Sequence, residues 1–415
     1  MIEYITPEKV KSLIANLSHL VFEVTDACNL RCKYCAYGEF YDDYDKRNNR
    51  CLPIEQAIKL INYQYSQWTS YRNTASKNNI RISFYGGEPL LNFRFIEEIV
   101  NYVTNDIKNS RLDFSFAMTT NGLLLDKHVD FLFEKQFHLL ISLDGNITNN
   151  SYRVDTKGCN SFERVVHNIN LIKEKYPSYY SEFVNFNAVI HNMNSVESIY
   201  DFFTKTYGKI PRIGELNTVG IRKDKIEAFY QMFKSSHYSL LESKKASAIE
   251  DAMFLKTERY KELCLFLHQY SGYMFEDYCD LICENLEKVK IPTGTCLPFS
   301  KKMFITVNGK ILPCERIGHH FYLGQITDKK VDLNPIEIAQ KYNQYYDRIS
   351  KQCTECSNQK ACKQCLFSLD NIETEPICRG YMNEEDFRNY SQRQLFFLSK
   401  HPEKYRQIME KSIII

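Results

Sequence analysis

The chain has 415 residues, with 53 Lys or Arg against 51 Asp or Glu, so its formal net charge is only +2. Such a balanced charge gives no electrostatic reason to expect a nucleic acid or an anionic membrane as a partner. The sequence does not open with a basic segment and an apolar core, and no apolar stretch approaches the roughly 18 residues that a membrane span needs. We therefore expect a cytoplasmic protein that binds neither nucleic acid nor membrane.

Short apolar, β-rich segments alternate with amphipathic segments through the first half of the chain. The expected strands cover residues 19–25, 80–85, 112–118, 138–143, 183–190 and 210–216, and the expected helices lie near 53–66, 94–108, 126–136, 161–175 and 195–207. Strands separated by helices of this length form parallel βαβ units. Six such units are too few for a closed eight-stranded barrel. The sequence therefore predicts an α/β fold built as a partial (β/α)6 barrel.

The composition changes after the sixth expected strand. Residues 222–290 have a polar, mostly helical pattern, seven cysteines occur between residues 291 and 380, and residues 383–412 form a charged helical tail. We expect five segments, which are an N-terminal segment (1–18), the barrel (19–221), a helical bridging region (222–290), a cysteine-rich domain (291–380) and a C-terminal tail (381–415).

Three cysteines follow the first expected strand in a Cys-x3-Cys-x2-Cys spacing, namely Cys28, Cys32 and Cys35. The chain has 15 cysteines and no visible export signal, so clustered cysteines indicate metal or redox sites rather than disulfides. A [4Fe–4S] cluster normally takes four cysteine ligands, so three thiolates leave one iron open to a small molecule. A zinc site that recruits Cys51 as a distant fourth ligand is the alternative.

A second group of cysteines lies in the C-terminal region. It consists of Cys296, Cys314, Cys353, Cys356, Cys362, Cys365 and Cys378. Two Cys-x2-Cys pairs often form a structural zinc site, but these pairs are close together for a zinc ribbon and three cysteines would lack partners. Residues 302–312 predict a β-hairpin with Asn308-Gly309 as a two-residue turn, which we expect to bring Cys296 and Cys314 together.

The triad resembles the signature of the radical S-adenosylmethionine (SAM) superfamily. The segment Tyr85-Gly86-Gly87-Glu88-Pro89, which closes the second expected strand, is similar to the Gly-Gly-Glu-Pro motif of that family. The seven-cysteine pattern resembles the SPASM domain, which binds two auxiliary [4Fe–4S] clusters. The resemblance implies that the open iron is chelated by SAM. It also implies that one electron from the cluster generates a 5′-deoxyadenosyl radical, which abstracts a hydrogen from the substrate.

The resemblance also implies a set of SAM-binding residues. They are, in chain order, Tyr34, Gly86, Gly87, Glu88, Asn121, Ser142, Asp144 and Arg153. In the family the aromatic residue at position 34 packs near the adenine, and Glu88 with nearby carbonyl groups would hold the methionine ammonium. Arg153 would pair with the methionine carboxylate. The polar residues that follow the third and fourth strands complete the site, where relatives place groups that contact the ribose.

The same resemblance assigns the auxiliary cysteines by matched position. Cys296, Cys314 and Cys365 would hold the first auxiliary cluster, and Cys353, Cys356, Cys362 and Cys378 would hold the second. No cysteine lies between residues 296 and 314 to complete the first cluster. Cys279 or Cys283 could serve, or that iron could be open to a substrate thiolate. With the triad, the expected cofactors are three [4Fe–4S] clusters and SAM.

Glu315 directly follows Cys314. In the sulfatase-maturing branch of the family an Asp at this position is implicated as the substrate base, so Glu315 is the candidate catalytic residue. The alternative is a surface carboxylate paired with Arg316.

Several other side chains match no motif. We expect the His319-His320 pair to face solvent. We expect Cys51, Cys159 and Cys264 to be buried apolar residues.

We interpret the chain as a SPASM-type radical SAM enzyme that modifies a ribosomally made precursor peptide, through a thioether or carbon–carbon crosslink or a related oxidation. The alternatives are an anaerobic sulfatase-maturing enzyme, which oxidises Cys or Ser to formylglycine, and a zinc-thiolate protein without catalysis. The sequence Pro-Cys-Glu-Arg, in place of Pro-Cys-Asp, favours peptide maturation. The expected partners are a peptide or protein substrate and an external electron donor such as flavodoxin or ferredoxin.

Overall fold

The computed structural model describes residues 4–271 and 294–411. The chain divides into two compact units. The barrel unit comprises Lys11–Ala252 and Pro298–Asn334, and the helical unit comprises Met1–Val10, Met253–Leu297 and Pro335–Ile415. The two units group residues that contact one another in space, so they do not test the five segments expected along the sequence. Those five segments remain a prediction.

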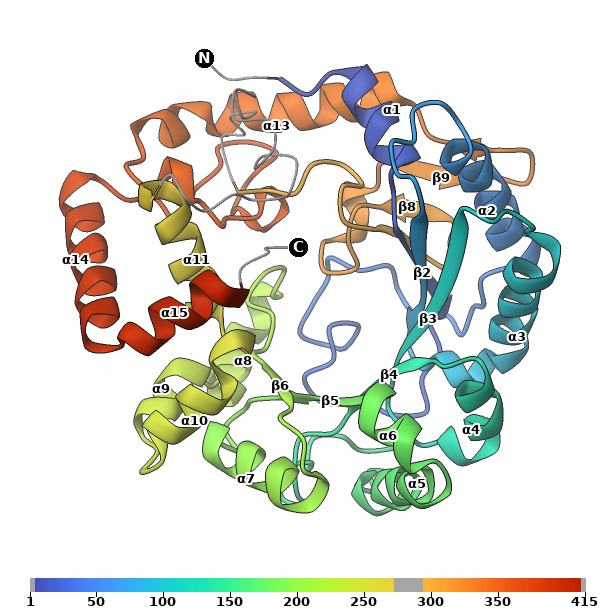
Figure 1. Cartoon of the computed structure of the whole chain (residues 1–415), viewed down its shortest axis with the longest axis horizontal. Coiled ribbons are helices and arrows are strands. Elements are labelled where there is room, and N and C mark those ends of the chain that lie inside the picture. The colour runs from blue at the N-terminus through green and yellow to red at the C-terminus, as the bar shows by residue number, and fades with distance from the viewer. Residues whose placement is uncertain (1–3, 272–293, 412–415) are drawn as a thin grey trace. The chain divides into compact units, whose positions relative to one another are not determined.

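A ten-stranded sheet forms the core of the barrel unit (Figure 1). Its strands are β1 (His19–Thr25), β2 (Asn78–Gly86), β3 (Leu112–Thr120), β4 (His138–Ser142), β5 (Val184–Val189), β6 (Arg212–Gly214), β7 (Met303–Ile305), β8 (Lys310–Leu312), β9 (Gly324–Ile326) and β10 (Val331–Asp332). They are ordered β10-β9-β8-β7-β1-β2-β3-β4-β5-β6. Strands β1 to β6 pair in parallel, each with the next. This arrangement confirms the predicted partial barrel.

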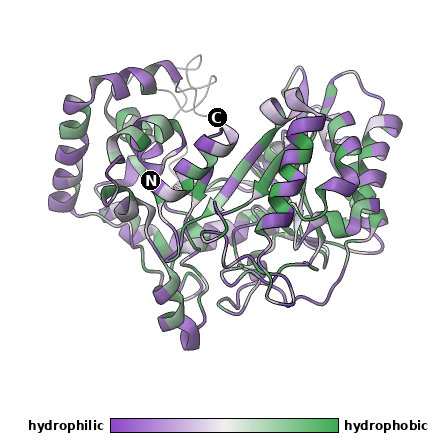
Figure 2. Cartoon of the chain, turned by 90° about the horizontal axis from the view of Figure 1, so that it is seen from below, coloured by the Kyte–Doolittle hydropathy of each residue, from purple (hydrophilic) through white to green (hydrophobic). Residues whose placement is uncertain are grey.

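Helices connect these strands. They are α1 (Pro7–Ala15), α2 (Ile54–Trp68), α3 (Phe93–Asn101), α4 (Leu125–Glu134), α5 (Phe162–Lys175), α6 (Pro177–Phe183), α7 (Val196–Tyr207), α8 (Ile226–Met232), α9 (Ser236–Leu241) and α10 (Ala246–Met253). In Figure 1, α2 to α7 lie on the outer side of the curved sheet. Figure 2 shows mainly hydrophobic strands beside helices of mixed hydropathy. This banding is typical of helices that bury one stripe against a sheet.

Local sequence explains where α7 begins and ends. Ser195 is its N-cap and accepts a hydrogen bond from the backbone N–H of Ser198, while the Ser198 hydroxyl accepts one from the backbone N–H of Ser195. Gly208 ends the helix with a left-handed φ of 63°. This combination of an N-terminal capping box and a C-terminal glycine satisfies helix-end groups that would otherwise lack partners.

Strand β1 is buried along almost its whole length, and it leads directly into the cysteine triad. Its residues are buried except for His19. Leu20 pairs with Ile82 of β2 on one side and with Met303 of β7 on the other. A strand with neighbours on both edges and cover on both faces needs a continuous apolar sequence, which explains why this segment was predictable.

The hairpin of β7 and β8 extends the sheet on the other side of β1. Phe304 pairs with Leu312 in the antiparallel arrangement that the sequence predicted. The connection has three residues, 307–309, rather than the expected two. Thr306 and Lys310 are the pair that closes it, and the Thr306 N–H donates to the Lys310 carbonyl at 3.0 Å. Gly309 takes a left-handed φ of 74°, as the last residue of a three-residue hairpin loop commonly does.

The helical unit contains α11 (Glu258–Ser271), α13 (Pro335–Glu355), α14 (Glu384–Lys400) and α15 (Pro402–Lys411). One of its cores joins α11 to α15 through Leu263, Phe266 and Ile408. The expected helical character of residues 222–290 is present up to Ser271, and the remainder lies outside the described residues. The predicted C-terminal tail is helical, and Asn383 caps α14 by accepting the Asp386 N–H at 2.8 Å.

Short helical turns complete the described chain. They are 3-10 turns at Pro89–Asn92, Lys223–Lys225, Phe254–Lys256, His319–Phe321, Gln359–Ala361 and Leu366–Ser368, with a π-helical turn at Tyr102–Asp106. Within residues 4–271 and 294–411, no helix has both the length and the hydropathy that crossing a bilayer requires.

Candidate functional site

The three cysteines of the triad lie on the loop that follows β1. The Cys35 N–H donates to the Cys32 carbonyl at 3.1 Å, and the Leu30 N–H donates to the Cys28 sulfur at 3.4 Å. Burial, with smaller contributions from the charges of Cys35 and Cys28, raises the pKa of the Cys32 thiol to about 12. A bound metal would remove the protons of these three thiols outright, because coordination stabilises the thiolate.

Two glycines hold the second strand end against the segment that precedes the triad. The Gly87 N–H donates to the Thr25 carbonyl and the Glu88 N–H to the Ala27 carbonyl, both at 2.8 Å. A Cβ added to Gly87 would lie 2.0 Å from the Ala27 oxygen, and one added to Gly86 would lie 2.3 Å from the Thr25 oxygen. Only glycine permits so close an approach of two backbones.

Glu88 connects the ends of β2 and β3. Its carboxylate accepts hydrogen bonds from the Thr120 hydroxyl and the Asn121 N–H, each at 2.7 Å. Burial raises the pKa of Glu88 to about 7 despite these donors. Asn121 in turn donates to the Asn29 side chain at 2.7 Å and reaches the Cys28 sulfur at 3.8 Å. The carboxylate that was expected to hold an ammonium therefore also fixes the loop beside the triad.

Asp144, at the end of β4, is the centre of a buried polar group. It is fully buried and accepts hydrogen bonds from the Tyr34 hydroxyl, from Arg153 Nη2 at 3.1 Å and from the Val189 N–H at 2.9 Å. Burial alone would raise the pKa of Asp144, but the Arg153 guanidinium and the other donors hold it below its usual value. His191 stacks on Tyr34 with ring centroids 5.8 Å apart.

The residues present fit the predicted SAM site in two respects. Arg153 is 7% exposed, and its Nε is buried without a hydrogen-bond partner, so the guanidinium keeps one free donor beside its bond to Asp144. The close backbone approach at Gly86 and Gly87 leaves carbonyl groups at the strand ends next to the triad. Ser142 is half-buried at the end of β4. The roles of these residues toward SAM remain predictions.

Arg47 is a contact of the triad that the sequence did not indicate. Its Nη2 lies 3.5 Å from the Cys35 sulfur, and its guanidinium lies 4.5 Å from the centroid of the Tyr37 ring. A cation that donates to a cluster sulfur affects the reduction potential of the cluster. No spacing rule marks this arginine, since it lies twelve residues beyond Cys35 on an irregular loop.

Glu315 is a half-buried residue of the barrel unit. Its side chain is 15% exposed and pairs with Lys302 at 3.0 Å rather than with Arg316. Burial alone would raise the pKa of Glu315, but the Lys302 ammonium, hydrogen bonds and the Arg316 charge together hold it below its usual value. Burial and the negative charges of Glu315 and Cys35 together raise the pKa of the Tyr85 hydroxyl.

The expectation that His319 faces solvent was wrong. Its ring is 2% exposed and packs 5.2 Å from the ring of Tyr44, with Nδ1 3.5 Å from Asp45. His320 is exposed as expected. The aromatic side chains around His319 come from the loop after the triad, a long-range pairing that the sequence pattern does not reveal.

The prediction for the three unassigned cysteines was correct for one of them. Cys264 is buried in the core between α11 and α15. Cys51 and Cys159 are exposed, which corrects the expectation that they fill apolar cores. Cys51 lies on a loop that forms an isolated bridge with Thr25, and Cys159 donates its N–H to Asp155 in a surface turn.

Four C-terminal cysteines gather in the helical unit. Cys353, Cys356, Cys362 and Cys378 line a hollow of about 20 Å³. Backbone N–H groups of Gly294 and Gln364 donate to the Cys362 sulfur at 3.1 and 3.4 Å. These four are the ligands predicted for the second auxiliary cluster, and N–H···S bonds of this kind surround iron–sulfur sites.

The ligands predicted for the first auxiliary cluster are divided between the two units. Cys296 and Cys365 belong to the helical unit and lie close together, since both thiols raise the pKa of the buried Tyr346. Cys314 belongs to the barrel unit. The alternative ligands Cys279 and Cys283 lie outside the described residues. Across the described ranges, no three His, Cys, Asp or Glu residues are arranged to hold a single metal ion.

Comparison with known proteins identifies two domains in the chain. Residues 22–204 match the radical SAM superfamily, and residues 296–366 match SPASM, an iron–sulfur cluster-binding domain. The cysteine-type anaerobic sulfatase-maturating enzyme of Clostridium novyi is 24% identical over 96% of both chains. The radical SAM cyclopropyl synthase TigE of Paramaledivibacter caminithermalis is 22% identical over 82% of this chain. This chain covers 65% of that relative's length.

Solved structures show the same fold. Native anSMEcpe with bound AdoMet superimposes with a TM-score of 0.62 over 94% of this chain and 99% of that chain, at 20% sequence identity. The likeness confirms the predicted α/β architecture with its C-terminal SPASM domain.

Proposed function

Because the chain belongs to the radical SAM superfamily and carries a SPASM domain, we propose that this enzyme modifies a ribosomally made precursor peptide by hydrogen abstraction. The modification would be a thioether or carbon–carbon crosslink or a related oxidation. Membership of this family makes the chain an oxidoreductase-type enzyme, which argues against a zinc-thiolate protein without catalysis.

One observation carries the proposal, namely that the half-buried Glu315 carboxylate lies beside a predicted cluster ligand, with its Oε2 3.7 Å from the Cys314 sulfur. A half-buried carboxylate can take a proton from a substrate group while a hydrogen atom is removed from a neighbouring carbon. Lys302 holds the Glu315 carboxylate at 3.0 Å and so fixes its position. Glu315 is therefore the proposed catalytic base.

The residues described above would hold the cofactors. Cys28, Cys32 and Cys35 would bind the SAM cluster, and the seven C-terminal cysteines would bind two auxiliary clusters, for three clusters in total. When bound, the clusters and SAM would supply the electron and the carbon radical that removes a substrate hydrogen. Arg153 would orient the methionine carboxylate through its free Nε, while Asp144 keeps the guanidinium in place. The electron would come from an external donor such as flavodoxin or ferredoxin.

A second candidate function is anaerobic sulfatase maturation. It is favoured by the match to the Clostridium novyi enzyme, which extends over 96% of both chains. The Glu at position 315, where the sulfatase branch carries Asp, favours peptide maturation instead. The two functions share the cofactors and the proposed base, so the substrate separates them.

The test uses anaerobically purified enzyme, reconstituted with iron and sulfide, reduced, and supplied with SAM. Three clusters predict about twelve irons per chain and release of 5′-deoxyadenosine. Short peptides encoded beside the gene are the first substrates, and a sulfatase-derived Cys peptide is the second. A product lighter by two hydrogens supports crosslinking, whereas loss of the cysteine sulfur supports formylglycine formation.

Variants of Glu315 test the base. Glu315→Gln should still cleave SAM but lose product formation by about 100-fold, and Glu315→Asp should retain part of the activity. Glu174→Gln, an exposed carboxylate on α5, is the matched control. If Glu315→Gln forms product at the rate of the control, Glu315 is not the base.

A further inference from the structure

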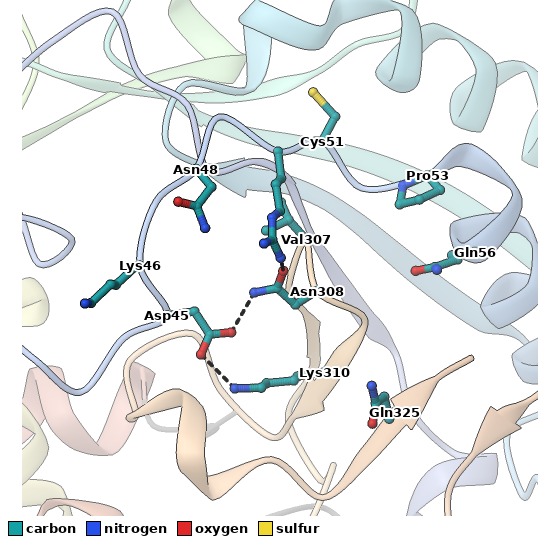
Figure 3. A pocket seen from close by; sticks show the side chains of 11 residues that line it. Asp45, Lys46, Asn48, Cys51, Pro53, Gln56, Val307, Asn308, Lys310 and Gln325 are labelled. Carbon is teal, nitrogen blue, oxygen red and sulfur yellow. Dashed lines mark hydrogen bonds and ion pairs between the residues drawn. The ribbon is translucent and has the colours of Figure 1, made fainter. Parts of the chain in front are cut away.

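A hollow of about 750 Å³ in the barrel unit lies outside the predicted catalytic residues. It is formed by the loop that leaves the triad, the start of α2, the β7–β8 hairpin and β9 (Figure 3). Its lining residues are Asp45, Lys46, Asn48, Arg50, Cys51, Pro53, Gln56, Val307, Asn308, Lys310 and Gln325. The volume lies within the range of ligand-binding sites. Most of the residues that line it carry polar or charged side chains, which can bind a polar ligand.

The charge of the lining is unbalanced. Asp45 is the acidic residue, and it already accepts hydrogen bonds from Lys310 at 2.7 Å and from Asn308 at 2.8 Å, as Figure 3 shows. Lys46 and Arg50 have no carboxylate partner in the described part of the chain. Two uncompensated cations in one hollow create a local positive potential that attracts anions.

The hairpin holds one of these cations in a defined position. Arg50 donates from Nη1 to the Asn308 side-chain oxygen at 2.7 Å, and its backbone N–H donates to the Asp26 carboxylate at 2.8 Å. Because both the main chain and the side chain of Arg50 are anchored, less conformational entropy is lost when it binds a ligand.

The start of α2 adds two further donors. Its N-cap is Pro53, which makes no side-chain capping bond, and the N–H groups of Ile54 and Glu55 have no partner among the described residues. Free N–H groups at a helix N-terminus carry partial positive charge. They add to the cations of the same hollow and favour a carboxylate over a cation.

We propose that this hollow binds an acidic segment of the peptide substrate. The inference rests on the proposed function, since it names the chemistry of the peptide that the enzyme recognises. An extended peptide with side-chain carboxylates matches the two cations, the helix N–H groups and the amide side chains of Gln56 and Gln325. The same loop carries Arg47, whose Nη2 lies 3.5 Å from the Cys35 sulfur, so the docking site and the triad share one segment of chain.

The test measures binding of a short fluorescein-labelled peptide of alternating Glu and Gly to the cluster-loaded enzyme by anisotropy. The double variant Lys46→Glu/Arg50→Glu should weaken binding at least about tenfold, and raising the ionic strength should weaken it in the wild type. The same variant should gain affinity for a peptide of alternating Lys and Gly. The matched control is Lys108→Glu/Lys127→Glu, which reverses two exposed charges elsewhere in the barrel unit.

Equal affinity of the wild type and the Lys46→Glu/Arg50→Glu variant for the acidic peptide would overturn the proposal. So would displacement of the peptide by inorganic phosphate at similar concentration, because that result indicates a small-anion site. Iron content and thermal midpoint identify a variant that has failed to fold, and the single variant Arg50→Gln then provides the comparison.

Release of 5′-deoxyadenosine is measured in parallel. If the wild type cleaves SAM but does not bind the acidic peptide, only the docking site is refuted, whereas a wild type that binds the peptide without cleaving SAM refutes only the proposed function.

Discussion

Replacing Asp144 with Asn should destabilise the barrel unit strongly, because it removes one charge from a buried ion pair. The side chains of Arg153 and Asp144 are 8% and 0% exposed, and their charged atoms lie 3.1 Å apart. At an effective dielectric constant of about 20, two unit charges at that distance attract by about 5 kcal/mol. Loss of one partner from a buried pair costs about 3–5 kcal/mol, since the other charge remains desolvated. We expect Asp144→Asn to fall in that range.

The assay is urea unfolding of the iron-loaded enzyme, followed by tryptophan fluorescence under anaerobic conditions. The chain has one tryptophan, Trp68, which is fully buried in α2 and donates its indole N–H to the Leu17 carbonyl at 2.7 Å. Its fluorescence therefore reports unfolding of the barrel unit alone.

Two further variants separate burial of charge from other effects. Asp144→Asn/Arg153→Met removes both charges and should recover most of the lost stability, because no buried charge is left unpaired. Glu98→Gln breaks an exposed pair with Arg94 and should cost about 0.5 kcal/mol or less. The reasoning fails if Asp144→Asn costs no more than Glu98→Gln, or if the double variant is as unstable as Asp144→Asn.

Two other predictions follow from the strand ends. Burial raises the pKa of Glu23 from 4.5 to about 7, so the folded chain keeps a proton there that the unfolded chain releases, and stability falls as the pH rises between those values. Glu23→Gln should remove up to about 3 kcal/mol of this pH dependence. Urea unfolding at several pH values measures it. The prediction is contradicted if the free energy of unfolding changes with pH equally in the variant and the wild type. Gly87→Ala places a Cβ 2.0 Å from the Ala27 oxygen and should abolish SAM binding in equilibrium dialysis. Gly214→Ala is the control, because its added Cβ has its nearest neighbour at 3.9 Å, and it should bind SAM normally. If Gly87→Ala also binds SAM normally, the close backbone approach at Gly87 is not needed for SAM binding.

Strands β1 to β5 could be predicted because the residues that they bury are mostly apolar. Strands β1 to β5 and their helices lie within a few residues of the predicted bounds, whereas β6 spans only Arg212–Gly214 of the predicted 210–216. The continuation of the sheet from β1 into β7 could not be predicted, because Leu20 and Met303 are far apart in sequence and no periodic pattern records their pairing.

The candidate site was likewise predictable only in part. The triad and the two glycines were visible because chemistry fixes both their identity and their spacing. The burial of Arg153, its bond to Asp144 and the contact of Arg47 with Cys35 were not visible, because they depend on how loops fold over the strand ends. Single charged residues on loops are usually solvated, so only the folded chain distinguishes these from surface residues.

The place of β1 between β2 and β7 has a consequence for synthesis on the ribosome. Strand β1 leaves the ribosome early, but its second edge is covered only when Met303–Ile305 has emerged. Until then the nascent chain carries an apolar strand with one row of open backbone groups, which is a template for aggregation. A polypeptide truncated before that point would be left with this edge exposed, so expression of the N-terminal half alone should yield insoluble protein.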